Sequence, residues 1–157
     1  MNDKRLPVLD PGAVEGVAGS NYPERFKSAV AGRSKKKLGD ALGLKNFGVN
    51  LTTLKPGVWS ALRHWHTHQD EFIYIVSGEL VLVTSEGEQE LTPGMMAGFP
   101  AGKADGHHLI NRGKTDAVYL EVGDRTAGDE VDYPDDDLAA RATPEGRRFT
   151  HKDGTLY

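Results

Sequence analysis

The chain has 157 residues, of which 38% are hydrophobic, and its formal net charge at pH 7 is -4. This length fits a single domain with a proper core, and the composition is that of a globular chain and excludes a disordered one. The absence of cysteine excludes disulfides and thiolate metal sites, which leaves histidine and carboxylate groups as the strong metal ligands. The negative net charge argues against nucleic acid as the main partner.

The sequence also argues against a membrane protein. No segment approaches the roughly 18 consecutive apolar residues of a membrane span. The first five residues include Asp3, Lys4 and Arg5 and lack the apolar centre of a secretory signal peptide. We therefore expect a cytoplasmic protein with no membrane partner.

The first forty-odd residues are rich in proline and glycine, which indicates an arm that wraps around the rest of the chain. Within it, residues 24–30 are compatible with a short helix after Pro23. Residues 33–37, with the sequence Arg-Ser-Lys-Lys-Lys, form a basic cluster. We interpret this cluster as a solvated loop or helix end, and the alternative is an anion or phosphate contact.

From residue 45 onward the chain alternates short apolar strands with turns. The expected strands are residues 47–54, 58–68, 71–77, 79–84, 95–99, 107–112 and 117–122. Short strands with turns every 8 to 12 residues or so predict an all-β sandwich or barrel. The polar tail after residue 123 is expected to be a solvated cover over one sheet, with a possible closing strand at residues 147–150.

Five of the six histidines fall within residues 64–68 and 107–108. Alternate side chains of a β-strand share a face, so His64 and His66 are expected to point the same way. With Glu71 they form a clamp of imidazole and carboxylate donors that suits a divalent first-row ion. Gathering these groups in a barrel interior would be unfavourable without a cation to pair them.

Two groups of residues resemble the sequence motifs of the cupin family. The first motif is matched by Gly57, His64, His66, Glu71 and Gly78. Six residues instead of five separate its first glycine from its first histidine, a difference that a β-bulge can absorb. The second motif is matched by Gly94, Pro100, Gly102, His107 and Asn111. Here four residues instead of two precede the histidine, so the loop before that ligand is longer.

The resemblance covers residues 47–122 and implies the cupin double-stranded β-helix, a jelly-roll barrel. The barrel core is expected at residues 45–123. Residues 1–44 would then be an N-terminal arm packed on the barrel, and residues 124–157 a C-terminal extension of the same domain.

The resemblance also implies a metal site and an oligomeric state. The expected ligands of one divalent transition metal, Zn, Fe, Mn, Ni or Co, are His64, His66, Glu71 and His107. Cupins commonly pair through a sheet, which implies a homodimer. Segments such as Tyr133-Pro134-Asp135 resemble a branch of small bacterial cupins, some of which carry sugar-phosphate isomerase labels that rest on fold analogy.

Strand parity predicts which residues surround the metal. On the ligand-bearing faces, the expected substrate-lining residues are Ser60, Leu62, Ile73 and Leu109. His68 has the same parity as the two clamp histidines and is a candidate for a catalytic or substrate-facing group. A solvated loop histidine is the alternative for His68.

Three neutral imidazoles, one carboxylate and a divalent ion carry a local charge of about +1, which favours a small anionic or enolate-like ligand. The expected function is a metal-dependent isomerase, lyase or dioxygenase that uses the ion as a Lewis acid on a small polar carbonyl or carboxylate compound. Isomerisation needs a general base, for which Glu71, His68 and Tyr119 are candidates. The alternative is a non-catalytic cupin that binds or senses a small ligand or metal.

Overall fold

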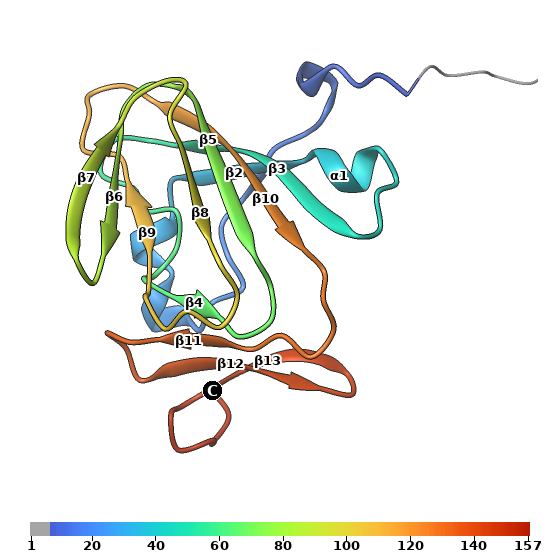
Figure 1. Cartoon of the computed structure of the whole chain (residues 1–157), viewed down its shortest axis with the longest axis vertical. Helices are drawn as coiled ribbons and strands as arrows, with labels where there is room; N and C mark the ends of the chain where they lie inside the picture. Colours follow the sequence, from blue (N-terminus) through green and yellow to red (C-terminus); the bar gives the residue numbers. More distant parts are fainter. Residues whose placement is uncertain (1–6) are drawn as a thin grey trace, which may run out of the picture.

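The computed structural model describes residues 7–157, and most of its regular structure is β-strand (Figure 1). The helical elements are short: 3-10 turns at Pro11–Ala13, Glu24–Phe26 and Ser28–Val30, and the α-helix α1 at Leu38–Ala41. Residues 24–30 thus form two 3-10 turns where one short helix was expected. None of the helices in the described part of the chain is long and apolar enough to cross a membrane.

The largest sheet has six antiparallel strands in the order β1-β2-β3-β10-β5-β8. These strands are β1 (Val17–Ala18), β2 (Arg33–Lys37), β3 (Phe47–Leu54), β10 (Ala117–Asp124), β5 (Glu71–Ser77) and β8 (Met96–Phe99). Alternation along β5 explains its two faces, because Ile73 and Ile75 are buried whereas Phe72 and Tyr74 are exposed. The inner face therefore supplies core residues and the outer face is apolar but uncovered.

Two smaller sheets complete the structure. A three-stranded sheet has the order β7-β6-β9, with β7 (Gly87–Leu91), β6 (Leu80–Thr84) and β9 (His108–Ile110). A four-stranded sheet has the order β13-β12-β11-β4, with β13 (Gly146–Thr150), β12 (Leu138–Thr143), β11 (Val131–Tyr133) and β4 (Trp65–His66). Figure 1 shows the four-stranded sheet across the lower end of the molecule, below the other two.

The apolar core has two parts. Residues of the six- and three-stranded sheets form the first cluster: Leu54, Ile73, Ile75, Leu80, Leu91, Leu109, Ala117 and Tyr119. Residues of the N-terminal arm and the C-terminal sheet, together with Leu62, form the second: Tyr22, Phe26, Val30, Leu62, Val131, Tyr133, Leu138 and Ala140. This nearly all-β arrangement confirms the predicted fold class and is consistent with a jelly-roll barrel.

The interpretation of residues 33–37 as a solvated loop or helix end is wrong. The segment is β2, and all five of its residues pair with β3. Arg33 is buried, and its guanidinium donates hydrogen bonds to the backbone carbonyl groups of Ser60 and Gly19. Lys35 also points inward, where it lines a cavity. Because the inward residues are themselves cationic, the strand has no apolar alternation by which the sequence could reveal it.

The expected strand at residues 58–68 is also corrected. Only Trp65–His66 is a regular strand, and residues 60–63 form a series of bends. His64 is held by an isolated bridge to His107. Side chains therefore do not alternate regularly through the bends, and the prediction that Leu62 faces the substrate site loses its basis.

The C-terminal tail is more than the solvated cover that its polar composition predicts. Its segments β11, β12 and β13 form a sheet with β4, and the strand expected at residues 147–150 is part of β13. Val131, Tyr133 and Leu138 are almost completely buried against the N-terminal arm. The apolar residues that pack here are scattered among polar ones, so the average composition of the tail is polar.

The turn after β5 depends on Gly78, whose φ angle is +73°. A Cβ atom at this position would lie 2.8 Å from the Cα and Cβ of Ala117 and 2.9 Å from the carbonyl oxygen of Asp116. Glycine is thus required here both by backbone conformation and by the close approach of β10.

We expect Gly78→Ala to lower the free energy of unfolding by about 2–5 kcal/mol, because left-handed strain and overpacking add. Gly57→Ala is the matched control, since Gly57 has a φ of +81° and open space around its Cβ position. Its loss should be limited to strain, about 1–2 kcal/mol. Urea denaturation measures both values, and equal losses would show that the contact with Ala117 is unimportant.

Candidate metal centre

Backbone pairing places His64 beside His107. The amide of His64 donates to the carbonyl oxygen of His107 at 3.2 Å, and the amide of His107 donates back at 2.9 Å. Residues that exchange both hydrogen bonds are directly opposite each other, with side chains on the same face. Their rings are consequently neighbours, with centroids 4.9 Å apart.

The imidazoles converge on the carboxylate of Glu71. Its Oε2 atom lies 2.9 Å from His107 Nε2 and 3.4 Å from His64 Nε2, and its Oε1 atom lies 3.5 Å from His66 Nε2. One donor atom each from His64, His66 and Glu71 can be chosen within 4.8 Å of one another. The structure therefore brings together the four predicted ligands. His107 joins the other three by its 2.9 Å contact with Glu71.

The outer nitrogens of two histidines are hydrogen-bonded, which determines where their protons lie. His64 Nδ1 lies 2.8 Å from the carbonyl oxygen of Leu62, and His66 Nδ1 lies 2.6 Å from Asp129 Oδ2. Since these oxygens can only accept, each Nδ1 carries the hydrogen and the neutral ring presents a lone pair at Nε2. His107 differs, because its Nδ1 is buried without a hydrogen-bond partner within residues 7–157.

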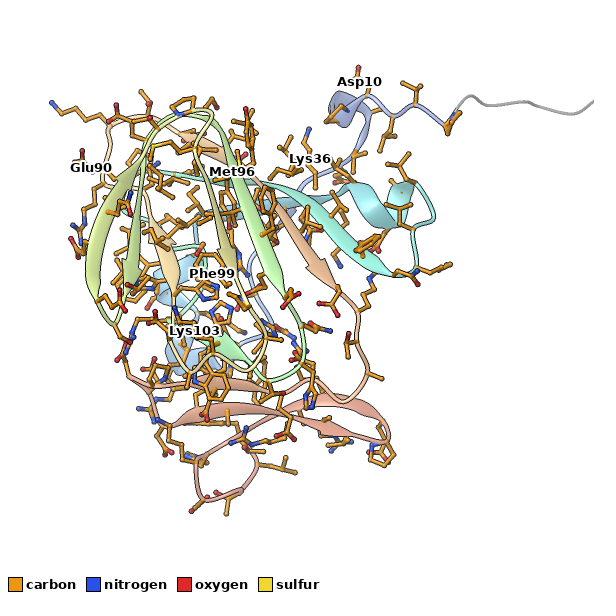
Figure 2. The ribbon with its side chains drawn as sticks, viewed as in Figure 1. Asp10, Lys36, Glu90, Met96, Phe99 and Lys103 are labelled. Atoms are coloured by element: carbon orange, nitrogen blue, oxygen red, sulfur yellow. The ribbon has the colours of Figure 1, made fainter. Side chains whose placement is uncertain are left out.

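Phe99 of β8, labelled in Figure 2, orients the His107 ring by stacking. The two rings lie 3.5 Å apart at an interplanar angle of 1°. This contact fixes the plane of the imidazole where no hydrogen bond does so. The His107 Nε2 atom is thereby held toward Glu71.

Electrostatics keep Glu71 ionised. Burial by itself raises the pKa of a carboxyl, but the imidazoles of His107 and His64 beside it outweigh that effect, so the pKa of Glu71 is well below its ordinary value. Burial likewise lowers the pKa of His64, yet Glu71 reverses the effect and raises it overall. For His107, burial prevails and lowers the pKa. The cluster therefore favours a negative charge on Glu71, whose Oε2 atom is buried.

The chemistry of this donor set fits a divalent metal ion. Glu71 Oε2 is buried without a well-aligned hydrogen bond, although two imidazole nitrogens lie within 3.5 Å of it. Lone pairs of neutral imidazoles facing a carboxylate repel one another unless a cation lies between them. Nitrogen and oxygen donors in this combination suit zinc, iron, manganese, nickel or cobalt.

Asp129 was missed by the sequence reasoning. It is 4% exposed, and its Oδ2 accepts hydrogen bonds from His66 Nδ1 and from Arg147, both at 2.6 Å. Its Oδ1 accepts from the backbone amides of His68 and Gln69. Asp129 precedes β11 in a stretch of acidic residues that resembles a solvated loop, so no local pattern distinguishes it.

A cavity of about 420 Å³ adjoins the cluster. Three of the expected lining residues, Ser60, Ile73 and Leu109, do line it. Leu62 instead lies in the second core cluster, because the bends at residues 60–63 turn it away from the cavity. His68 is exposed and does not line the cavity; its Nδ1 pairs with Thr67. The position of His68 is thus that of the solvated loop histidine.

A second polar cluster lines the same cavity. Glu121 Oε1 accepts hydrogen bonds from Lys35 Nζ at 2.5 Å and from Asn50 Nδ2 at 2.9 Å. Its Oε2 accepts from the hydroxyl of Tyr119 at 3.2 Å. Lys35 escaped the sequence reasoning because β2 was not recognised as a strand facing the interior. Glu121 lies on the expected strand at residues 117–122, but without its partner Lys35 nothing marked it as an inward carboxylate.

We expect Asp129→Asn to weaken metal binding about 10- to 100-fold, because the hydrogen bond that orients His66 loses its charge. Competition with a chromophoric chelator measures the affinity for zinc. Asp116→Asn is the matched control, since Asp116 is exposed and precedes β10 at the end opposite Gly123, the residue that pairs with Glu71. Unchanged zinc affinity in Asp129→Asn, with the native melting temperature, would rule out this role of Asp129.

Comparisons with known proteins agree with this fold. The family described as Cupin domain matches residues 50–123. A crystal structure of a sugar phosphate isomerase of the cupin superfamily from Silicibacter pomeroyi shares 46% identity, covers 96% of each chain and has a TM-score of 0.92. A protein from Acidithiobacillus ferrooxidans, proposed to be a sugar phosphate isomerase, shares 30% identity over 80% of each chain with a TM-score of 0.72.

More distant similarity is limited to the fold. A polyketide cyclase from Streptomyces resistomycificus shares 18% identity, covers 76% of this chain and 80% of its own, and has a TM-score of 0.63. Among curated proteins, none matches this chain. The family match and the two more similar structures establish that the chain belongs to the cupin superfamily.

Proposed function

We propose that this cupin is a metal-dependent enzyme that isomerises a small phosphorylated carbonyl compound, such as a sugar phosphate. The observation that carries the proposal is a cluster of His64, His66, Glu71 and His107 facing a cavity of about 420 Å³. This volume is in the range of small-molecule sites. The similarity to the Silicibacter pomeroyi protein supports an isomerase over a dioxygenase.

The four residues of the cluster would hold one divalent ion. When bound, such an ion supplies Lewis-acid chemistry, which polarises a carbonyl group. The Nδ1 hydrogen bonds of His64 and His66 keep their Nε2 lone pairs available, and Glu71 contributes one negative charge. The net local charge of about +1 favours an anionic ligand.

Other lining residues suit an anionic, partly polar compound. Cationic groups lie in the cavity wall: Arg33, and Lys35 and Arg147 in ion pairs with Glu121 and Asp129. Ile73, Leu109 and Phe99 supply apolar wall and restrict water near the cluster. Mixed walls of this kind favour a small molecule with a charged end and a carbon skeleton over a bare inorganic ion.

We also propose that the chain forms a homodimer through the outer face of the six-stranded sheet. Neighbouring strands place Leu51, Leu120, Tyr74 and Met96 in one row across this face. Tyr74 is 38% exposed and Met96, labelled in Figure 2, is 58% exposed. A flat apolar row is complementary to itself, so a second copy of the chain related by a two-fold axis fits it.

The metal and the reaction should depend on the same residues. We expect the purified full chain to contain stoichiometric divalent metal and to isomerise at least one aldose or ketose phosphate. His64→Ala/His107→Ala should lose both, because it removes two imidazole ligands. Elemental analysis and coupled product assays on a panel of triose to hexose phosphates provide the measurements, with His151→Ala as the control outside the cluster.

The outcomes separate the assignments. Stoichiometric metal that survives in His64→Ala/His107→Ala would make the ligand assignment wrong. Ligand binding without turnover would favour the non-catalytic binding or sensing cupin. Iron in the purified protein would favour a dioxygenase, whereas zinc, nickel or manganese would favour an isomerase or lyase.

For the dimer, we expect Tyr74→Arg to convert the protein to a monomer at micromolar concentration, because two charges would be buried at the centre of the interface. Gln89→Arg, on the exposed β7, is the matched control and should leave the dimer intact. Light scattering coupled to size-exclusion chromatography gives the mass. A monomeric wild-type chain would refute the dimer.

A further inference from the structure

We infer that Glu121 is the general base of this site, an inference that rests on the proposed isomerase function. Within residues 7–157, three carboxylates line the cavity: Glu71, Glu121 and Asp124. Glu71 is committed to the histidines. Asp124 accepts close hydrogen bonds on both oxygens, from the amide of Asp70 at 2.6 Å on Oδ1 and from the amide and hydroxyl of Thr126 on Oδ2. Glu121 differs, because its Oε2 accepts one long hydrogen bond of 3.2 Å, and it is therefore the carboxylate that we assign to proton exchange with a ligand.

The register of the sheet places Glu121 near the metal cluster but outside it. Glu71 pairs with Gly123 across β5 and β10, and Glu121 pairs with Ile73. Glu121 and Glu71 are therefore diagonal neighbours on the same inner face, with backbone positions about 7–8 Å apart. This separation leaves room for a ligand that touches both ends of the pair.

Glycines keep the space beside Glu71 open. Gly123 pairs with Glu71 on one side and with Gly48 on the other, and both glycines line the cavity. Glycine has no side chain, so the two positions that follow Glu71 across the sheet, on β10 and then on β3, present only backbone atoms to the cavity. A ligand carbon can therefore lie over these two positions and within reach of the Glu121 carboxylate.

The hydrogen bonds of Glu121 suit a base. Its Oε1 accepts from Lys35 Nζ at 2.5 Å and from Asn50 Nδ2 at 2.9 Å, so this oxygen is fixed in an ion pair. Its Oε2 accepts one long hydrogen bond of 3.2 Å from Tyr119. One oxygen is thus anchored, and the other retains a lone pair for the substrate proton.

The other candidates for a base are less suitable. His68 is exposed and does not line the cavity. Burial, reinforced by the charge of Glu121, raises the pKa of Tyr119 well above 10, so Tyr119 is a hydrogen-bond donor at neutral pH. Lys35 Nζ is engaged as the donor in its ion pair with Glu121.

The chemical step balances without an oxidant or reductant. Glu121 Oε2 takes the proton from the carbon next to the carbonyl, and the electron pair of that C–H bond forms a carbon–carbon double bond. The carbonyl oxygen accepts the displaced pair and then the proton of the neighbouring hydroxyl. Glu121 returns its proton to the former carbonyl carbon, which converts aldose to ketose.

The test is the exchange of carbon-bound hydrogen with solvent. The full chain, loaded with manganese, is incubated in D2O with ribulose 5-phosphate, fructose 6-phosphate or dihydroxyacetone phosphate, and exchange is followed by NMR. Glu121→Gln should lower the exchange rate about 100-fold or more, in line with the contribution of a general base. Its manganese content, affinity for the sugar phosphate and melting temperature should stay at the wild-type values.

Two further variants give the comparison. Glu88→Gln is the matched control, because Glu88 pairs with Arg112 on the exposed surface and does not line the cavity. Glu121→Asp retains the charge that Lys35 pairs with but withdraws the carboxylate by one methylene. It should fold and still lose exchange, so the inference remains testable if Glu121→Gln does not fold.

The outcomes distinguish this inference from the proposed function. Exchange by the wild-type chain that persists within a few-fold in Glu121→Gln, or in Glu121→Asp, overturns the role of Glu121 and leaves the isomerase function standing. Absence of exchange by the wild-type chain with all three sugar phosphates overturns the isomerase function, and the role of Glu121 with it.

Discussion

The carboxylate of Glu71, half-buried and with its Oε2 atom hidden from solvent, ties together distant segments of this fold. An ionised carboxyl in a protein interior is unfavourable unless positive charge and hydrogen bonds compensate it. Separate pairings bring the imidazoles to this carboxylate: His64 is bridged to His107, and His66 lies on β4, which pairs with β11. The pairing of distant strands therefore determines which groups surround the Glu71 carboxylate and so sets its electrostatic environment.

Local alternation made part of the fold and of the site predictable. Residues 47–54 and 71–77 were expected as strands and form β3 and β5 with the same bounds. The same reasoning, together with the cupin motifs, selected the histidines that the structure gathers around Glu71, and their role as metal ligands stays a prediction. These patterns are readable because each is contained within a few consecutive residues.

Contacts between distant segments were not predictable from local patterns. Asp129 orients His66 only because β11 pairs with β4, and Glu121 meets Lys35 only because β2 pairs with β3 and β3 with β10. The prediction for Leu62 was wrong for a different reason, because it assumed a regular strand where the chain bends. Polar residues that face inward look the same in sequence as solvated ones.

The hydrogen bond between His66 and Asp129 joins the C-terminal sheet to the candidate metal centre. Asp129 reaches His66 only while β11 is paired with β4, so a ligand held by His66 binds the docked arrangement in preference to an undocked one. By thermodynamic linkage, if docking of the C-terminal sheet strengthens binding at His66, then binding at His66 strengthens docking by the same free energy. The tail of this chain would then act as a latch whose closure is reinforced by the ion that it helps to retain.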